Sequence, residues 1–149
     1  MRTDVKIGMA ADHAGYDLKE FLKKYLVDKG FNVTDFGTNS GESSDYADYA
    51  HPLGSAIDKH ELDLGFSICG SGNGINMVVN KYANVRSALC WNVEIAKLAV
   101  EHNNANICAL PARFISKEVA IEIVDTFFST VFEGGRHQRR IDKIPIDKC

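Results

Sequence analysis

The stretch Leu64-Gly65-Phe66-Ser67-Ile68-Cys69-Gly70-Ser71-Gly72-Asn73-Gly74 decides the fold of this chain. Its first six residues form a short apolar run, which is typical of a strand buried on both faces. The glycines that follow predict a sharp turn, and residues 75–81 predict a helix. A glycine-rich turn between a strand and a helix points several backbone N–H groups at one spot, which then attracts negative charge.

Cys69 stands at the lip of this turn. A thiol that faces clustered N–H groups is expected to exist partly as thiolate, the reactive form. A base beside an anion-binding turn would suit chemistry on a substrate that becomes negatively charged. The alternative is a buried strand cysteine followed by an ordinary turn, and the stretch alone leaves both interpretations open.

The rest of the chain alternates strands with helices. Strands are predicted at residues 5–10, 31–36, 64–69, 85–90 and 106–110. Apolar stripes at helical spacing predict helices that carry residues 18–26, 49–59, 75–81, 95–102 and 120–131, with a last short helix over 136–143. Gly30 is expected to close the first helix, Asn92 and Ser116 to cap two later ones, and the polar stretch 37–48 to be a loop. This alternation predicts one domain over residues 1–149, a three-layer α/β/α sandwich with a Rossmann-like, five-stranded parallel sheet.

Composition narrows the class of protein. A chain of 149 residues can bury a core without disulfides, and a formal net charge of −3 argues against a nucleic-acid partner. The four cysteines form no C-x-x-C pair, so zinc and thioredoxin-like interpretations are weak. The start of the chain has no signal-peptide pattern, and the apolar run at residues 7–11 is too short to span a membrane. We therefore expect a cytoplasmic protein with no membrane partner.

The expected topology brings two turns together. Ligands of doubly wound sheets bind at the carboxyl ends of the strands, where the strand order reverses. If the first strand lies between the second and the third, then Asp12 and His13 face the turn that begins at Cys69. A dinucleotide site fits less well, because the first turn lacks the G-x-G-x-x-G pattern.

Several polar side chains also have structural interpretations. Asp12 could simply cap the first helix, and His13 could be a solvated turn residue. His102 lies on an apolar stripe, so its spacing alone favours a core histidine over a catalytic one. His51 and His60 are expected to be exposed and are assigned no role.

Arginines gather near the end of the chain. Arg136 and Arg140 are four residues apart and share a helical face, with Arg139 and His137 beside them. Such pairs are usually solvated, yet this one could bind a phosphate. Arg113 follows the fifth strand and is at the correct edge of the sheet to join a site there.

Short motifs follow one another in a fixed order over nearly the whole chain. They are Asp12-His13-Ala14-Gly15, Asp35-Phe36-Gly37-Thr38, Asp45-Tyr46, Ile68-Cys69-Gly70-Ser71-Gly72, Asn80-Lys81, Arg86, His102-Asn103, Arg113 and Glu133-Gly134-Gly135-Arg136-His137. In these motifs the chain resembles the ribose-5-phosphate isomerase B family, which also contains the galactose-6-phosphate and allose-6-phosphate isomerases. The last motif is similar to the ribose-5-phosphate branch and is typically missing from the galactose-6-phosphate subunits.

The resemblance implies an aldose–ketose isomerase of the pentose phosphate pathway, which interconverts ribose 5-phosphate and ribulose 5-phosphate through an enediolate. Cys69 would be the proton-transfer base, and Ser71 and His102 would assist sugar-ring opening. The residues implied to hold the sugar oxygens are Asp12, Gly70, Gly72, Asn73, Gly74 and Asn103, and those implied to bind the phosphate are His13, Arg113, Arg136 and Arg140. The resemblance implies no metal and no organic cofactor. A six-carbon substrate, allose 6-phosphate or galactose 6-phosphate, stays open.

The chain departs from the family pattern at Ala47, Asn73, Asn104 and Pro111, and of these Asn73 could alter the anion-binding turn. Topology adds a further expectation. His102 ends the fourth helix, so it belongs at the opposite edge of the sheet from Cys69 of the same chain. Both can serve one site if His102 and Asn103 reach into a partner's cleft across a two-fold axis. We therefore expect a homodimer, or a dimer of dimers, with shared sites.

Two other classes of protein remain as alternatives. A nucleotide-binding α/β module without catalysis would use the same edge of the sheet. A redox protein would need Cys90 or Cys108 close to Cys69.

Overall fold

The computed structural model describes residues 3–146 and contains one five-stranded sheet. The strands are β1 (Lys6–Ala11), β2 (Asn32–Asp35), β3 (Leu64–Cys69), β4 (Ser87–Leu89) and β5 (Ile107–Pro111). Their order is β2-β1-β3-β5-β4, and every neighbouring pair is parallel. The predicted parallel sheet is confirmed, as is the placement of the first strand between the second and the third.

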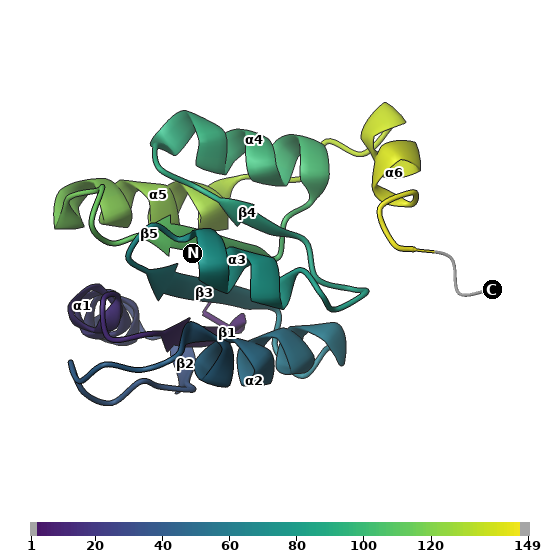
Figure 1. Ribbon diagram of the computed structural model, residues 1–149. Coiled ribbons are helices and arrows are strands. Elements are labelled where there is room, and N and C mark those ends of the chain that lie inside the picture. The colour runs from purple at the N-terminus through teal and green to yellow at the C-terminus, as the bar shows by residue number, and fades with distance from the viewer. Residues whose placement is uncertain (1–2, 147–149) are drawn as a thin grey trace.

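Helices cover both faces of this sheet. They are α1 (Tyr16–Asp28), α2 (Tyr46–Asp58), α3 (Asn73–Val79), α4 (Val93–Asn103), α5 (Lys117–Ser129) and α6 (Arg136–Ile141). One core cluster joins the sheet to α1, α4 and α5, and a second joins it to α2 and α3. Figure 1 shows α2 and α3 together on one side of the sheet, with α4 and α5 on the other. The three-layer α/β/α sandwich is therefore confirmed.

The residues predicted to cap or end helices do so in the structure. The Asn92 side chain accepts the Ile95 N–H at 2.9 Å, and the Ser116 hydroxyl accepts the Val119 N–H at 3.1 Å. Gly30 follows α1 with a φ of 92°, a left-handed conformation that glycine adopts without steric cost. These caps fix where each helix starts or stops relative to the sheet.

Several boundaries differ from the sequence prediction by one to three residues, among them the start of α2, the end of α5 and helix α3, which spans Asn73–Val79 rather than residues 75–81. Helix α2 begins at Tyr46 rather than at residue 49, because the polar segment before it ends at Asp45 in an extended capping conformation. Helix α5 ends at Ser129, and the Thr130 hydroxyl donates to the Thr126 carbonyl at 2.6 Å. The predicted position of Val131 on the apolar face of this helix is therefore wrong, and its side chain is 79% exposed.

Among residues 3–146, no helix combines the length and the apolar character needed to cross a membrane.

Candidate active site

Cys69 ends β3, the central strand of the sheet, and is 4% exposed. The next turn of chain is tight: Gly72 has a φ of 76°, and a Cβ there would lie 2.4 Å from the Leu89 side chain. Only glycine fits such a position. The turn leads directly into α3 at Asn73, so the predicted strand, glycine-rich turn and helix are confirmed.

Ser71 and Asn73 interact with each other in this turn. The Asn73 N–H donates to the Ser71 hydroxyl at 3.3 Å, and both side chains are exposed. A ligand at the carboxyl end of β3 would therefore meet the Ser71 side chain. The Asn73 N–H, by contrast, already has an acceptor within the turn.

The turn after β1 lies beside this loop. Ala11 pairs with Ile68 across the β1–β3 ladder, so Asp12 is level with Cys69 on the neighbouring strand. Adjacent strands are about 4.8 Å apart. The Asp12 carboxylate is 7% exposed and accepts the N–H groups of Ala14 and Gly15 at 3.0 and 3.1 Å. The N-cap of α1 is Gly15, without a side-chain hydrogen bond, so the interpretation of Asp12 as the helix cap is wrong. Asp12 orders the turn before α1 and lies at the candidate site.

His13 is oriented by a segment far away in the sequence. Its backbone N–H donates to the Ser44 hydroxyl at 3.1 Å, and its Nδ1 accepts the Ser44 N–H at 3.2 Å. A backbone N–H can only donate, so Nδ1 is an acceptor and the ring proton is on Nε2. His13 is a half-buried turn residue, and its two hydrogen bonds to Ser44 orient its ring.

A cavity of about 600 Å³ opens at these two residues. Its lining comprises Asp12, His13, Ser43, Ser44, Asp45, Tyr46, Ala47 and Asp48. The Tyr46 ring also packs over the loop after β3, because a Cβ at Gly74 would lie 2.5 Å from it. No site role was predicted for the wall formed by residues 43–48. Its signal in the sequence was the Asp45-Tyr46 pair, an acidic residue and an aromatic residue that end a polar loop.

Arg113 comes to the same edge from β5. Its N–H donates to the Gly70 carbonyl at 3.0 Å, and the Phe114 N–H donates to the Pro111 carbonyl at 2.9 Å. A Cβ at Gly70 would lie 3.2 Å from the Arg113 guanidinium. Pro111 ends β5 level with Cys69, and the turn after it brings the Arg113 cation against the glycine-rich loop.

His102, Asn103, Arg136 and Arg140 lie elsewhere. His102 and Asn103 end α4, and α6 packs against α4 there. In Figure 1, α6 projects at the right beyond the end of α4, whereas α1 follows β1 at the left. Arg136 and Arg140 are exposed on α6. The predicted position of His102 at the edge opposite Cys69 is confirmed. A single chain therefore does not bring His102, Asn103 and the α6 arginines close to Cys69.

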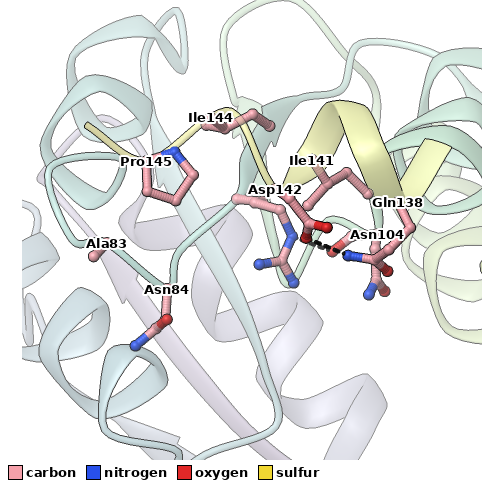
Figure 2. A pocket seen from close by; sticks show the side chains of 9 residues that line it. Ala83, Asn84, Asn104, Gln138, Ile141, Asp142, Ile144 and Pro145 are labelled. Atoms are coloured by element: carbon pink, nitrogen blue, oxygen red, sulfur yellow. Dashed lines mark hydrogen bonds between the residues drawn. The ribbon is translucent and has the colours of Figure 1, made fainter. Parts of the chain in front are cut away.

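Two further cavities lie near α6, and Cys69 is absent from the lining of all three cavities. The one of about 290 Å³ is drawn in Figure 2, where Gln138 and Asp142 of the α6 region approach Asn104 and are joined by a 2.7 Å hydrogen bond. Arg86 also lines it and donates through Nε to the Asn104 carbonyl at 2.9 Å, while burial lowers the pKa of its guanidinium. The second, of about 660 Å³, includes Asn103 in its lining.

The other described cysteines do not form a redox pair with Cys69. Cys69 is level with Pro111 on β5, three residues beyond Cys108, a separation of roughly 10 Å along the strand. Burial raises the pKa of the Cys108 thiol well above its usual value, and the adjacent Cys90 raises it further. All three thiols are free, and Cys149 lies outside the described residues. The structure therefore offers Cys69 no resolving partner among Cys90 and Cys108.

Fold and site together define a doubly wound α/β protein whose ligand cleft lies at the carboxyl edge of the sheet, with a thiol beside a glycine-rich turn. A family model described as Ribose/Galactose Isomerase matches residues 7–144. The chain therefore belongs to the ribose/galactose isomerase family.

Individual relatives agree with this assignment. Ribose-5-phosphate isomerase B of Escherichia coli strain K12 is 40% identical over 139 residues, which cover 93% of each chain. A crystal structure of a ribose 5-phosphate isomerase from Thermotoga maritima has a TM-score of 0.93 at 51% identity, covering 95% of this chain and 98% of the other. Ribose-5-phosphate isomerase B from Mycoplasma genitalium, solved with bound ribulose 5-phosphate, has a TM-score of 0.91 at 43% identity, covering 96% and 95%.

Proposed function

We propose that this protein interconverts ribose 5-phosphate and ribulose 5-phosphate, with Cys69 as the base. The observation that carries the proposal is that Cys69, the glycine-rich turn, Asp12 and His13 lie at the same edge of the sheet. The fold is also that of an isomerase solved with bound ribulose 5-phosphate. Membership of the ribose/galactose isomerase family supports the same reaction class.

The reaction moves one proton between neighbouring carbons. In the open-chain aldose, the Cys69 thiolate removes the proton from C2, and the electron pair passes through C1 onto the aldehyde oxygen to give an enediolate. The thiol then returns a proton to C1, while the C2 hydroxyl proton passes to the C1 oxygen and leaves a ketone at C2. Backbone N–H groups of the turn after β3 stabilise the negative oxygens, and one such donor is typically worth about 3 kcal/mol.

The phosphate serves as a remote handle. Its binding energy positions the reacting carbons beside Cys69. Arg113, against Gly70, supplies a cation at this edge, and His13 supplies an Nε2–H donor. Neither group competes with Cys69 for the carbon-bound proton. Different residues therefore bind the phosphate and transfer the proton.

Ring opening needs an acid–base group, and histidine titrates in the right range. We assign this role to His102 of the partner subunit, with Asn103, Arg136 and Arg140 arriving from the same partner. Support comes from their position at the opposite edge of the sheet and from exposed apolar side chains at both edges. Met77, Trp91 and Phe114, which are 65%, 52% and 75% exposed, follow the carboxyl ends of the strands, and Ile144 and Ile146 follow α6. Contiguous exposed apolar surface often marks a protein interface, and a dimer contact at these two edges would bury such side chains.

The test compares two sugar phosphates with EDTA present throughout. We expect turnover of ribose 5-phosphate that EDTA does not reduce, with a higher kcat/KM than for allose 6-phosphate, measured by the appearance of each ketose. The reverse preference would reassign the substrate within the family. If neither sugar phosphate is turned over while adenine nucleotides raise Tm, the protein is a binding module and not an isomerase. A reducing, cytoplasmic setting is part of the proposal, because Cys69 must remain a thiol for this chemistry.

A further inference from the structure

Three metal-ligating side chains meet where α6 packs on α4. His102 comes from the last turn of α4, Glu133 from the segment between α5 and α6, and His137 from α6. Their ligand atoms all lie within 4.8 Å of one another. Glu133 and His137 are four residues apart in the sequence, and the packing of α6 on α4 brings His102 to them.

The backbone holds this cluster in place. The Glu133 N–H donates to the Glu101 carbonyl at 3.1 Å, which ties the Glu133 segment to α4. The His137 side chain is almost fully buried, and its Nε2 lies 3.2 Å from the Glu133 carboxylate. The His102 and His137 rings stack with centroids 4.5 Å apart at 14°.

We propose that His102, Glu133 and His137 form a binding site for a divalent transition-metal ion of the zinc class. Two imidazoles and one carboxylate are a known zinc ligand set, with a fourth position left for water. Bonds of about 2.0–2.1 Å in tetrahedral geometry place ligand atoms roughly 3.3 Å apart. The cluster must therefore contract by about 1.5 Å at most, and the half-exposed Glu133 side chain can supply part of that movement. The His102 ring must also turn out of its stack on His137, because two imidazoles stacked face to face cannot both direct an in-plane lone pair at one ion.

The surrounding charges bear on which ion is bound. Arg136, Arg139 and Arg140 are exposed on α6 and oppose any cation, whereas the Glu133 carboxylate attracts it. Hard ions such as Mg²⁺ prefer oxygen ligands and gain little from two imidazoles, whereas Zn²⁺ and Co²⁺ bind imidazole well. The site is therefore selective for transition metals over Mg²⁺ and Ca²⁺.

Occupancy would have a consequence for catalysis, which rests on the proposed function. A metal bound to His102 removes that imidazole from acid–base chemistry at the partner's cleft. The ion would then act as a reversible inhibitor and not as a cofactor of the proton transfer.

Binding is measured apart from activity. Zn²⁺ titration calorimetry and the visible absorption of Co²⁺ are recorded on a Cys69→Ser/Cys149→Ser protein, so that neither thiol can hold the ion. We expect one ion per chain. Loss of even an outer partner of a metal ligand costs about 10–100-fold in affinity, so Glu133→Gln and His137→Asn should each weaken binding by about tenfold or more. His60→Asn is the matched control: His60 is exposed, outside the cluster, and has a positive φ that asparagine tolerates.

Enzyme activity is the second measurement, and it is made on protein that keeps all its native cysteines. Zn²⁺ should lower the rate of isomerisation, and EDTA should restore the rate. Zn²⁺ should inhibit Glu133→Gln less than it inhibits His60→Asn, when each variant is compared with its own rate without metal. Absence of binding, or equal binding by Glu133→Gln and His60→Asn, overturns the site. Binding at the cluster without inhibition supports the site and counts instead against the role of His102 in ring opening.

Discussion

His13 shows how a single residue at this site obtains its chemistry. Its Nδ1 accepts the Ser44 N–H, so the ring proton stays on Nε2 and is available to a phosphate oxygen. Parallel-strand topology was enough to predict that His13 and Cys69 share an edge. The tautomer could not be predicted, because it depends on Ser44, which lies 31 residues away in a loop with no periodic pattern.

At the same scale, Cys69→Ser tests the base. A serine hydroxyl is far less acidic than a thiol, so turnover of ribose 5-phosphate should fall by about two to four orders of magnitude. The side chain is nearly isosteric and 4% exposed, so the fold and the rise in Tm on substrate binding should persist. Steady-state kcat measures the loss of turnover, and thermal melts with and without substrate measure the fold and substrate binding. Near-normal turnover by the variant would remove Cys69 from the mechanism.

A partly buried cluster of charged side chains joins helix α1 to the sheet. The Lys19 side chain is fully buried, and its ammonium lies 2.7 Å from Asp35 of β2 and 2.7 Å from Glu20. Lys23 adds a second contact to Asp35 at 2.8 Å. Burial alone would raise the pKa of Asp35, but hydrogen bonds from Lys19, Lys23 and the Gly37 N–H outweigh it and lower the pKa below its usual value.

The element-scale prediction concerns Asp35→Asn. The folded pKa of Asp35 is depressed, so its stabilisation is complete above the ordinary value of 3.8 and is lost as pH falls through the folded pKa. Near neutral pH the variant leaves the buried Lys19 cation with Glu20 as its remaining partner, and the free energy of unfolding should fall by about 3 kcal/mol, the low end for breaking a buried ion pair.

Urea unfolding at neutral pH and at successive values below 3.8 checks this dependence. The gap between the wild-type protein and the variant should shrink as the solution becomes more acidic. Asp28→Asn, which removes an exposed pair with Lys24 on the same helix, is the control and should change little at any pH. A gap that does not change with pH would mean that packing, and not the charge of Asp35, holds α1 in place.

The elements of this fold differ in how well the sequence predicts them. Strong apolar runs such as β3 and clear caps such as Asn92 and Ser116 predicted the correct type of element. The start of α2 was missed because Tyr46, Ala47 and Asp48 continue a polar loop without a change of composition. Lys19 resembled a surface residue between apolar positions, and only the acidic partner from β2 explains its burial.

At the scale of the whole molecule, the residues proposed for the site lie at two opposite edges of the sheet. Cys69, Asp12 and Arg113 belong to the carboxyl edge, and His102 and the arginines of α6 belong to the other. Neighbouring strands are parallel, so each connecting helix brings the chain back to the amino edge, and a residue that ends α4 cannot reach the Cys69 turn of its own chain. A two-fold dimer would join both edges twice and complete two equivalent sites.

Mixing two inactive variants tests this division. Cys69→Ala and His102→Ala are combined in equal amounts, dissociated reversibly and reassociated, with subunit exchange confirmed by native mass spectrometry. Half of the dimers should be mixed, and each mixed dimer contains one site with both residues intact, so about one quarter of wild-type activity should return. Cys69→Ala mixed with an inactive Asp12→Asn is the matched control. Asp12 and Cys69 lie at the same edge of one chain, so no mixed dimer contains an intact site and no activity should return. Confirmed exchange without recovery in the first mixture would contradict the shared-site dimer, and His102 would then lose its assigned role, because the position of α4 keeps it away from Cys69 of its own chain.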